Sequence, residues 1–556
     1  MAERLFGLET EYAIVPIAGS EGQKTPDERV SMLRARAREA LPGLPDTGQS
    51  GVFLANGSRF YIDCGHHPEW TTPEVANPWD AVRYILAGER WLTRLCDDLA
   101  GGGPAPFTLF KTNVDYTAGV TWGCHESVLY KTSTPGALAG RLMSLLVTRI
   151  IFTGAGGFDP FSPGIEFVLS PRALFLQRES SADSTRNRGI AHEKQEHLCG
   201  HGYRRWHLVC GESLNSEIAM WLRSATLVLA VSLEERGHVD FGVPVRLASP
   251  VEALHALSRD PSCRVPLALA GGGDMTAVQI QRYYLEQAEA RIGADFMPPW
   301  AGTACTYWRA MLDRLESAPA SVATTLDWAI KRALFERMLH RRGHNWEWVR
   351  AWNDALAALR DRVREEPAAR GMRRLEELID PPEPILACQA ETAGMLAADG
   401  LEWAGIGEFA RVRRELFEAD ARFSALGPES LFAQLDRDGV LTHRVPGVDN
   451  IEHAMEHPPA VGRAGLRGAV IRRLMPLGNQ FAAYWTGIVN RQDGSTLDLS
   501  HPFETEERWL PAERSPGVTV GGFDQIGQPA FLRPRVPVPP ERAVAPPSAE
   551  DDPRVA

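Results

Sequence analysis

A short stretch early in the chain places reactive side chains at alternate positions. Residues 59–74 read RFYIDCGHHPEWTTPE. Side chains alternate between the two faces of a β-strand, so Arg59, Tyr61 and Asp63 would share one face. The residues between and after them are Phe, Ile and Cys, which predicts an apolar back. The pattern therefore predicts a strand that carries chemistry on one face only.

The prolines that follow predict how further side chains join this face. Pro68 and Pro73 restrict the backbone and favour a turn. We expect this turn to bring Glu69 and Thr72 back towards the reactive face. One arginine, two acids and two hydroxyl groups would then converge there.

A second pair of acids lies near the start of the chain. Glu9 and Glu11 are two residues apart, so they share one face of a predicted strand. Carboxylates at this spacing suit Mg²⁺, which takes oxygen ligands and usually shares them with substrate phosphate. Taken alone, the pair is more typical of a solvated sheet face.

The two segments together favour a site over coincidence. Each segment presents acids on one strand face, and the chain has no zinc-type spacing of cysteine and histidine. We therefore predict a Mg²⁺ and phosphate site built from both segments.

Weaker signals accompany this site. Lys111 and His125 are candidate ligand contacts, although a lone histidine is more often structural. The run YRRWH at residues 203–207 predicts a cationic lip that suits an acidic or phosphorylated substrate. The same region contains His192, His197, Cys199, His201 and His207. Their spacings match no tetrahedral motif, so we do not expect zinc.

Composition narrows the class of protein. The chain has 556 residues, of which 44% are hydrophobic and 23% charged, which is typical of a globular protein with two or three domains. A net charge of -12 argues against a nucleic-acid partner. We expect no signal peptide and no membrane span, because the apolar runs are too short. Eight cysteines without a CxxC pair predict reduced thiols and a cytoplasmic location.

Periodicity predicts a mixed α and β chain around one substantial sheet. Strand-like runs cover residues 9–16, 52–64, 107–113, 165–169 and 205–211. Helical patterns cover residues 26–41, 77–100, 138–151, 321–341 and 346–365. Near the C-terminus we expect a helix at 463–477, a strand at 481–489 and a short helix at 502–510. We predict a catalytic domain over 1–435, a small domain over 436–513 and a Pro-rich, disordered tail over 514–556.

These motifs resemble those of a known family. The resemblance rests on GLETEY at 7–12, NGSRFYID at 56–63, HPE at 67–69 and GCHE at 123–126, and continues through 203–213, 326–331 and 463–485. The chain resembles the Pup ligase and Pup deamidase family of carboxylate-amine ligases, which is related in fold to glutamine synthetase and glutamate-cysteine ligase. The resemblance implies an α+β fold with a large, curved, mostly antiparallel sheet, flanking helices and a small C-terminal domain.

The resemblance also implies roles for individual residues. The family's Mg²⁺ positions match Glu9, Tyr61 and Glu69. Its ATP contacts match Arg59, Thr72 and Trp485. Its catalytic base matches Asp63. The alternative for Trp485 is a core residue of the small domain.

Two features bear on the branch and the substrate. About 35 residues separate the first two predicted strands, and the family's deamidase has a long loop there, so the ligase branch is favoured. Residues 191–199 read AHEKQEHLC, where the family has NTRDEPHAD. The two segments share only the histidine. Because that segment lines the family's active site, the change bears on the carboxylate substrate more than on ATP.

The leading hypothesis is an ATP-dependent ligase that joins the C-terminal glutamate of a small Pup-like protein to lysines of target proteins. In the family, ATP converts the glutamate carboxylate to an acyl phosphate, which the lysine amine then attacks. The alternatives are a deamidase or isopeptidase of the same modifier, a small-molecule γ-glutamyl ligase, and a non-catalytic protein that binds the modifier or ATP.

Overall fold

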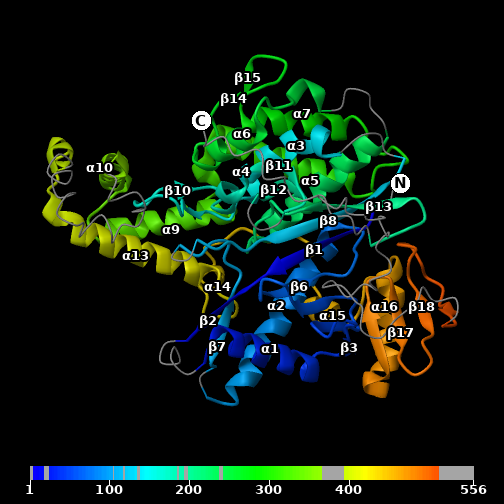
Figure 1. The fold of residues 1–556 in the computed structure, drawn as a ribbon. Coiled ribbons are helices and arrows are strands. Elements are labelled where there is room, and N and C mark those ends of the chain that lie inside the picture. Colours follow the sequence, from blue (N-terminus) through cyan, green and yellow to red (C-terminus); the bar gives the residue numbers. More distant parts are fainter. Residues whose placement is uncertain are drawn as a thin grey trace, which may run out of the picture.

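The computed structural model describes residues 4–17, 24–103, 105–116, 119–133, 138–183, 187–192, 198–236, 242–365 and 393–512. The predicted disordered tail over 514–556 lies outside the described residues. Strands are concentrated in residues 6–208 and 481–510 and helices dominate the part between them, so the fold is α+β (Figure 1).

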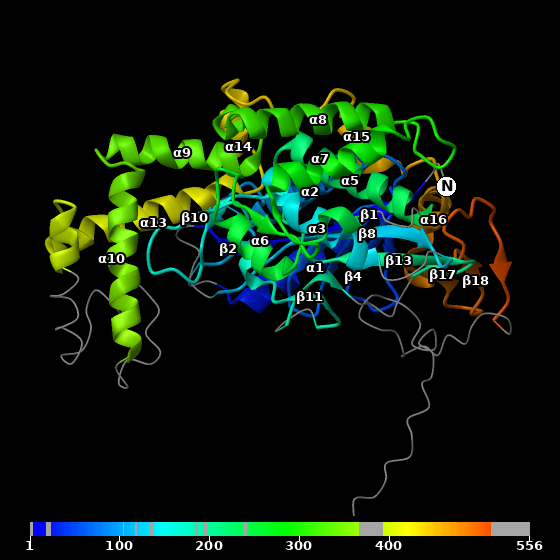
Figure 2. The same cartoon turned by 90° about the horizontal axis from the view of Figure 1, so that it is seen from above.

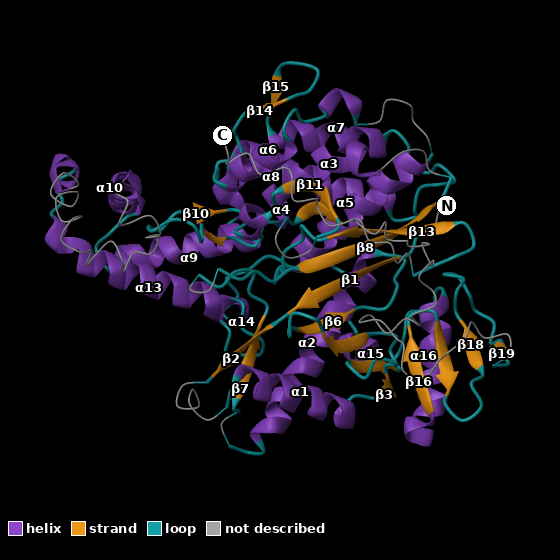
Figure 3. Ribbon diagram, viewed as in Figure 1, coloured by secondary structure: helices purple, strands orange, loops and turns teal. Residues whose placement is uncertain are grey.

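A nine-stranded sheet forms the centre of the molecule (Figure 3). Its strands lie in the order β11-β12-β13-β8-β1-β6-β5-β4-β3. Their bounds are β11 Arg178–Ser181, β12 Gly189–His192, β13 Tyr203–Leu208, β8 Cys124–Lys131, β1 Phe6–Glu11, β6 Pro68–Thr71, β5 Arg59–Ile62, β4 Gly51–Leu54 and β3 Gly43–Pro45. Only β11 and β12 are parallel, and every other neighbouring pair is antiparallel. The predicted fold class, a large and mostly antiparallel sheet with flanking helices, is confirmed.

The reactive stretch is a meander of short strands. The run predicted over 52–64 is two strands, because Asn56-Gly57 forms a tight turn in which Gly57 has a φ of 83°. A second turn follows β5, where the Asp63 amide donates to His67 O at 3.0 Å. The turn expected at Pro68 and Pro73 therefore lies earlier, between Asp63 and His67. Pro68 instead begins β6, which is a position that a strand tolerates.

Helices cover the apolar face of this sheet. They are α1 Pro26–Ala40, α2 Pro78–Ala100, α3 Leu138–Thr148 and α5 Glu217–Glu235. Helix α1 begins with a capping box, in which Thr25 Oγ1 accepts from Glu28 N and Glu28 bonds back to the Thr25 amide. Phe60 and Trp70, from β5 and β6, are fully buried beneath α1 and α2. The front face is left for polar side chains.

Further helices extend the body to one side (Figure 2). Helices α6 Pro250–Ser258, α7 Ala277–Glu289 and α8 Ala301–Ser317 pack on the main core. Helices α9 Asp327–Arg341, α10 Trp346–Glu365 and α13 Ile406–Phe423 share a separate core rich in Trp and Phe. None of the helices in the described ranges is long and apolar enough to cross a membrane.

A small C-terminal module has a sheet of its own. Helix α16 Arg463–Leu474 precedes four antiparallel strands, β16 Phe481–Tyr484, β17 Gly487–Asn490, β18 Thr496–Asp498 and β19 Trp509–Leu510. The short helix predicted near 502–510 is wrong. That segment contains turns and then β19, which pairs with β18 through Leu497 and Trp509. The segment is too short to form a stable helix by itself. Pairing with β18 gives its backbone groups hydrogen-bond partners instead.

Gly88 allows α2 to approach β6. A Cβ atom at this position would lie 2.4 Å from Trp70 Nε1. We predict that Gly88→Ala destabilises the protein by roughly 1–3 kcal/mol, because the helix and the buried ring must move apart. Urea unfolding would measure the change.

Gly140, in α3, provides a matched control, since no atom lies within 4 Å of its added Cβ. There Gly→Ala is expected to stabilise by up to about 1 kcal/mol through helix propensity alone. Equal stability of the two variants would show that the contact with Trp70 is unimportant.

Candidate active site

Strand pairing gathers the predicted acids on one face of the sheet. Glu11 lies opposite Glu69, and Glu69 lies opposite Tyr61. Two residues before Glu11 on β1, Glu9 lies opposite His125 of β8. Residues that are directly paired point to the same side of a sheet, so all five side chains share the front face. The two segments that the sequence analysis combined are thus brought together.

Four carboxylates crowd this face. Glu69 is 4% exposed, and its Oε2 accepts no hydrogen bond from the residues that the structure describes. Burial raises the pKa of Glu69 well above its usual value, and the negative charges of Glu9, Glu11 and Asp63 raise it further. A buried oxygen without a donor, surrounded by like charge, fits a divalent cation with oxygen ligands.

The phenol oxygen of Tyr61 lies beside the carboxylates of Glu9 and Glu69. Its phenol donates a hydrogen bond to Glu9 Oε1. Burial raises the pKa of Tyr61 well above its usual value, and the charges of Glu69 and Glu9 add to this. The phenol therefore stays protonated at neutral pH and acts as a donor within the acidic cluster. The predicted metal set of Glu9, Tyr61 and Glu69 forms one contiguous group.

Arg59 is more deeply enclosed than a phosphate ligand at the surface would be. Its guanidinium forms a buried ion pair with Asp46, with Nη2 and Oδ2 2.7 Å apart, and bonds Ser50 Oγ at 3.2 Å. The guanidinium also stacks over the Tyr61 ring at 4.0 Å from its centroid. No motif in the sequence predicted Asp46 as the partner of Arg59. In this arrangement Arg59 fixes the ring of Tyr61.

Asp63 lies just beyond the end of β5, at the edge of the acidic cluster. Its Oδ1 accepts from the His67 amide at 2.6 Å, and its Oδ2 lies 3.5 Å from His67 Nδ1. Burial lowers the pKa of the His67 ring, but the contacts with Asp63 outweigh burial and raise it overall. Asp63 keeps 17% of its side chain exposed, so it can meet an incoming substrate.

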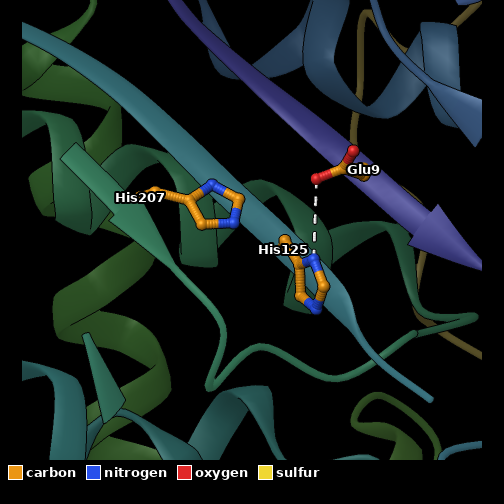
Figure 4. Close-up of side chains that lie close together, drawn as sticks. All are labelled: Glu9, His125 and His207. Atoms are coloured by element: carbon orange, nitrogen blue, oxygen red, sulfur yellow. Dashed lines mark ion pairs between the residues drawn. The ribbon is translucent and has the colours of Figure 1, made fainter. Parts of the chain in front are cut away.

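Two histidines extend the site across β8 and β13. His125 Nδ1 lies 3.5 Å from Glu9 Oε2, and the ring of His207 lies 5.5 Å from that of His125 (Figure 4). Ser127 Oγ, 3.1 Å from His207 Nδ1, orients the second ring. Ligand atoms of Glu9, His125 and His207 all lie within 4.8 Å of one another. These three side chains are close enough for their ligand atoms to meet at one ion.

The structure separates the histidines that the sequence places close together. The His192 ring lies 5.7 Å from that of His207, whereas His201 packs on His501 in the C-terminal module. Cys199 donates to Tyr203 O at 3.4 Å. His197 lies outside the described residues. Lys111 is buried in an ion pair with Glu89.

Arg172 is a neighbour of the site that the sequence analysis missed. It follows the short strand β10 Phe167–Val168 and is 2% exposed. Its Nη2 lies 3.3 Å from His125 Nε2 and donates to Val209 O at 3.0 Å. No motif marks this arginine in the sequence, because only the fold brings its loop to β8.

A pocket continues from the acids towards the C-terminal module. It has a volume of about 90 Å³ and contains Glu9, Tyr61, Thr72 and Trp485 in its lining. Thr72 Oγ1 accepts from the Leu8 amide at 3.0 Å, which joins β1 to the end of β6. The pocket thus brings four predicted site residues to one cavity between the sheet and the module.

Comparison with protein families identifies the chain at the family level. The family model described as "Pup-ligase protein" matches residues 4–356 and 400–489. The chain belongs to this Pup-ligase family.

Individual relatives include both branches. The chain is 36% identical over 307 residues to a Pup deamidase/depupylase of Mycolicibacterium smegmatis, covering 54% of this chain and 61% of that protein. It is 33% identical over 368 residues to a Pup--protein ligase of Corynebacterium glutamicum (61% and 73%). It is 29% identical over 518 residues to a Pup--protein ligase of Rhodococcus opacus (91% and 97%). The match therefore spans about three-fifths of the length of the deamidase relatives.

Solved structures match over most of the chain. The complex between the prokaryotic ubiquitin-like protein Pup and its ligase PafA gives a TM-score of 0.67 at 26% identity, covering 90% of both chains. The Pup ligase PafA in complex with ADP gives 0.61 at 27% identity, covering 86% of this chain and 91% of that one.

Glu212 supports the loop that carries Arg172, and its ionisation predicts a pH effect. The carboxylate accepts from the amides of Ala155 at 2.7 Å and Arg172 at 2.9 Å. Burial nevertheless raises the pKa of Glu212 to about 7. The folded state therefore binds this proton more tightly than the unfolded state does, so its contribution to stability falls as pH rises from about 4.5 to about 7.

The loss over this range is roughly 3 kcal/mol, from 1.36 kcal/mol per pKa unit. We expect Glu212→Gln to remove this part of the pH dependence. The stability of the variant relative to the wild type should therefore increase between pH 4.5 and 7. Urea unfolding at both pH values would measure the gain. A difference that does not change with pH would contradict the raised pKa.

Proposed function

We propose that this protein is an ATP- and Mg²⁺-dependent ligase that forms an isopeptide bond between the C-terminal glutamate of a Pup-like modifier and lysines of target proteins. The observation that carries the proposal is the crowding of four carboxylates beside a pocket that the sheet shares with the C-terminal module. Such a face attracts cations, and a cation-charged face suits the phosphates of a nucleotide.

The comparisons support this reaction. The two ligase relatives act, by their names, on Pup and protein, and the solved PafA structures contain Pup in one case and ADP in the other. We infer that ATP is the co-substrate and that the pocket near Thr72 and Trp485 takes the nucleotide.

The donor set fits Mg²⁺ held by Glu9, Tyr61 and Glu69. When bound, the ion would neutralise negative charge on the nucleotide phosphates. Arg59 has a supporting part in this proposal, because its guanidinium stacks on Tyr61 and holds that ring in place.

The chemistry requires activation of both partners, because a carboxylate and a protonated lysine do not condense at neutral pH. Transfer of the γ-phosphoryl group to the glutamate carboxylate forms an acyl phosphate and releases ADP. Asp63 then accepts a proton from the lysine ammonium, and the free amine attacks the acyl carbon and expels phosphate. The position of Asp63, partly exposed and oriented by the His67 amide, suits this step.

A second candidate is removal of the modifier by hydrolysis. The specific observation in its favour is the 36% identity to a Pup deamidase/depupylase, although that match covers only 54% of this chain. The same Asp63 would then activate water instead of an amine. The short connection between the first two predicted strands favours the ligase.

We also propose the domain division into residues 1–435, 436–513 and 514–556. The separate four-stranded sheet of β16 to β19 supports a distinct C-terminal unit. We propose a cytoplasmic location, which is supported by the lack of a disulfide among the seven described cysteines.

Asp63→Asn tests the proposed base. The amide keeps the size of the side chain but cannot accept the proton, so we expect conjugation to fall by about 100-fold or more. Binding of ADP should be unchanged. The assay follows ADP release and the gain in mass of a target protein, with ATP, Mg²⁺ and a Pup that ends in glutamate.

Asp27→Asn is the matched control, because Asp27 forms an exposed ion pair with His66 nearby. Normal conjugation by Asp63→Asn would reject the assigned base. Release of Pup from a preformed conjugate, without ligation by the wild type, would favour the second candidate.

Glu69→Gln tests the cation. We expect the variant to be at least as stable as the wild type in EDTA, since one of the crowded charges is removed. Stabilisation by Mg²⁺ in thermal unfolding should need at least about tenfold more ion, because a charged ligand is lost.

Glu39→Gln, at an exposed position on α1, should respond to Mg²⁺ as the wild type does. Identical Mg²⁺ titrations of Glu69→Gln and the wild type would exclude Glu69 as a ligand.

A further inference from the structure

Helix α16 of the C-terminal module inserts two arginines into the catalytic part of the protein. Arg463 is 5% exposed and Arg467 is fully buried. Both guanidinium groups bond Glu74, which lies three residues after the end of β6. We refer to Glu74, Arg463 and Arg467 as the clasp.

Arg467 joins three separate segments. Its Nη2 donates to Glu74 Oε2 at 2.5 Å and to Gly57 O at 3.1 Å. Its Nη1 donates to Glu74 Oε1 at 3.3 Å and to Trp485 O at 3.2 Å. The guanidinium carbon also lies 5.0 Å from the centroid of the Trp485 ring. One side chain thus fixes Trp485 relative to the β4–β5 turn and to Glu74.

Arg463 makes a parallel set of bonds at the pocket wall. Its Nε donates to Glu74 Oε1 at 2.7 Å. Its Nη1 donates to Leu499 O at 3.1 Å, and its Nη2 donates to Leu198 O at 2.7 Å. Leu198 belongs to the segment 191–199 that departs from the family pattern. The clasp therefore also holds one end of that segment.

The clasp forms part of the nucleotide pocket itself. Glu74 and Arg463 line the same cavity as Thr72 and Trp485. Burial opposes ionisation of Glu74, but the charges of Arg467 and Arg463 outweigh it and lower the pKa of Glu74 to about 2. At neutral pH the clasp is therefore one carboxylate against two guanidinium groups, which leaves a net positive charge at a cavity proposed to take a polyphosphate.

We propose that Glu74 is a positioning residue that couples nucleotide binding to docking of the C-terminal module. Glu74 holds Arg463 and Arg467, these hold α16 and Trp485, and only the docked module completes the pocket. This inference rests on the proposed function. By linkage, a nucleotide that binds only the completed pocket must in turn stabilise the docked module.

The first test compares the affinity for ADP, with Mg²⁺, of the full-length wild type and of Glu74→Gln by calorimetry. Glutamine keeps the shape but loses the charge that holds both arginines, so we expect affinity to fall about tenfold. Glu507→Gln is the matched control. Glu507 forms an ion pair with Arg473 of α16, the helix that carries both arginines of the clasp, but this pair is exposed. The control should bind ADP as the wild type does.

The second test uses the wild type alone and does not depend on how any variant folds. Hydrogen exchange of the amides in α16, β16 and β17 should slow when ADP and Mg²⁺ are added, while α7 on the far side of the core should not respond. A clasp with a purely structural role would leave this exchange unchanged.

The outcomes separate the two proposals. If the wild type binds no ADP, the nucleotide site is rejected and the clasp with it. If the wild type binds ADP but Glu74→Gln binds it equally well, only the clasp is rejected. If Glu74→Gln does not fold, unchanged exchange in the wild type rejects the clasp, and slower exchange in α16 and β16 supports it.

Discussion

Repulsion among four carboxylates is the constraint on which the rest of the structure depends. Glu9, Glu11, Asp63 and Glu69 come from two strands and a turn, yet they meet on one face, where Glu69 is nearly buried. Such an arrangement is unfavourable unless a proton or a cation balances the negative charge and the backbone is held rigidly. The opposite face of the same strands supplies the rigidity, because Phe60 and Trp70 are fully buried under helices.

The polar front is organised as two adjoining regions. The acids and His125 lie at the centre of the sheet, and the pocket beyond them is completed by the C-terminal module. Arg172, from the short helical turn after β10, contacts His125. The proposed nucleotide would occupy the pocket end of this front. Two described residues of the segment 191–199 lie at its borders: His192 pairs with His207 of β13, and Leu198 O accepts a hydrogen bond from Arg463 of the module.

Alternation along single strands was enough to predict the acidic face. Arg59, Tyr61 and Glu69 belong to adjacent strands whose register follows from short turns, so local sequence carried the information. The sequence pattern predicted neither the turn at Asn56-Gly57 nor the correct position of the second turn. Neither error changes which face the acids occupy. Local signals also predicted several helices, among them α1, α2, α3, α9, α10 and α16.

Contacts between distant segments could not be predicted in this way. The pairing of Arg59 with Asp46 and the approach of Arg172 to His125 depend on loops that only the assembled sheet brings together. The bonds from α16 to Glu74 join residues almost 400 positions apart. The strand β19 was predicted as a helix because its partner β18 could not be known from periodicity.

An isotope-labelling experiment tests whether the reaction passes through an acyl phosphate. A Pup labelled with ¹⁸O in the side-chain carboxylate of its C-terminal glutamate would be conjugated with ATP, Mg²⁺ and a lysine-containing target. If the acidic face transfers phosphate to that carboxylate, one labelled oxygen must appear in the released inorganic phosphate. Conjugation that releases only unlabelled phosphate would contradict the account.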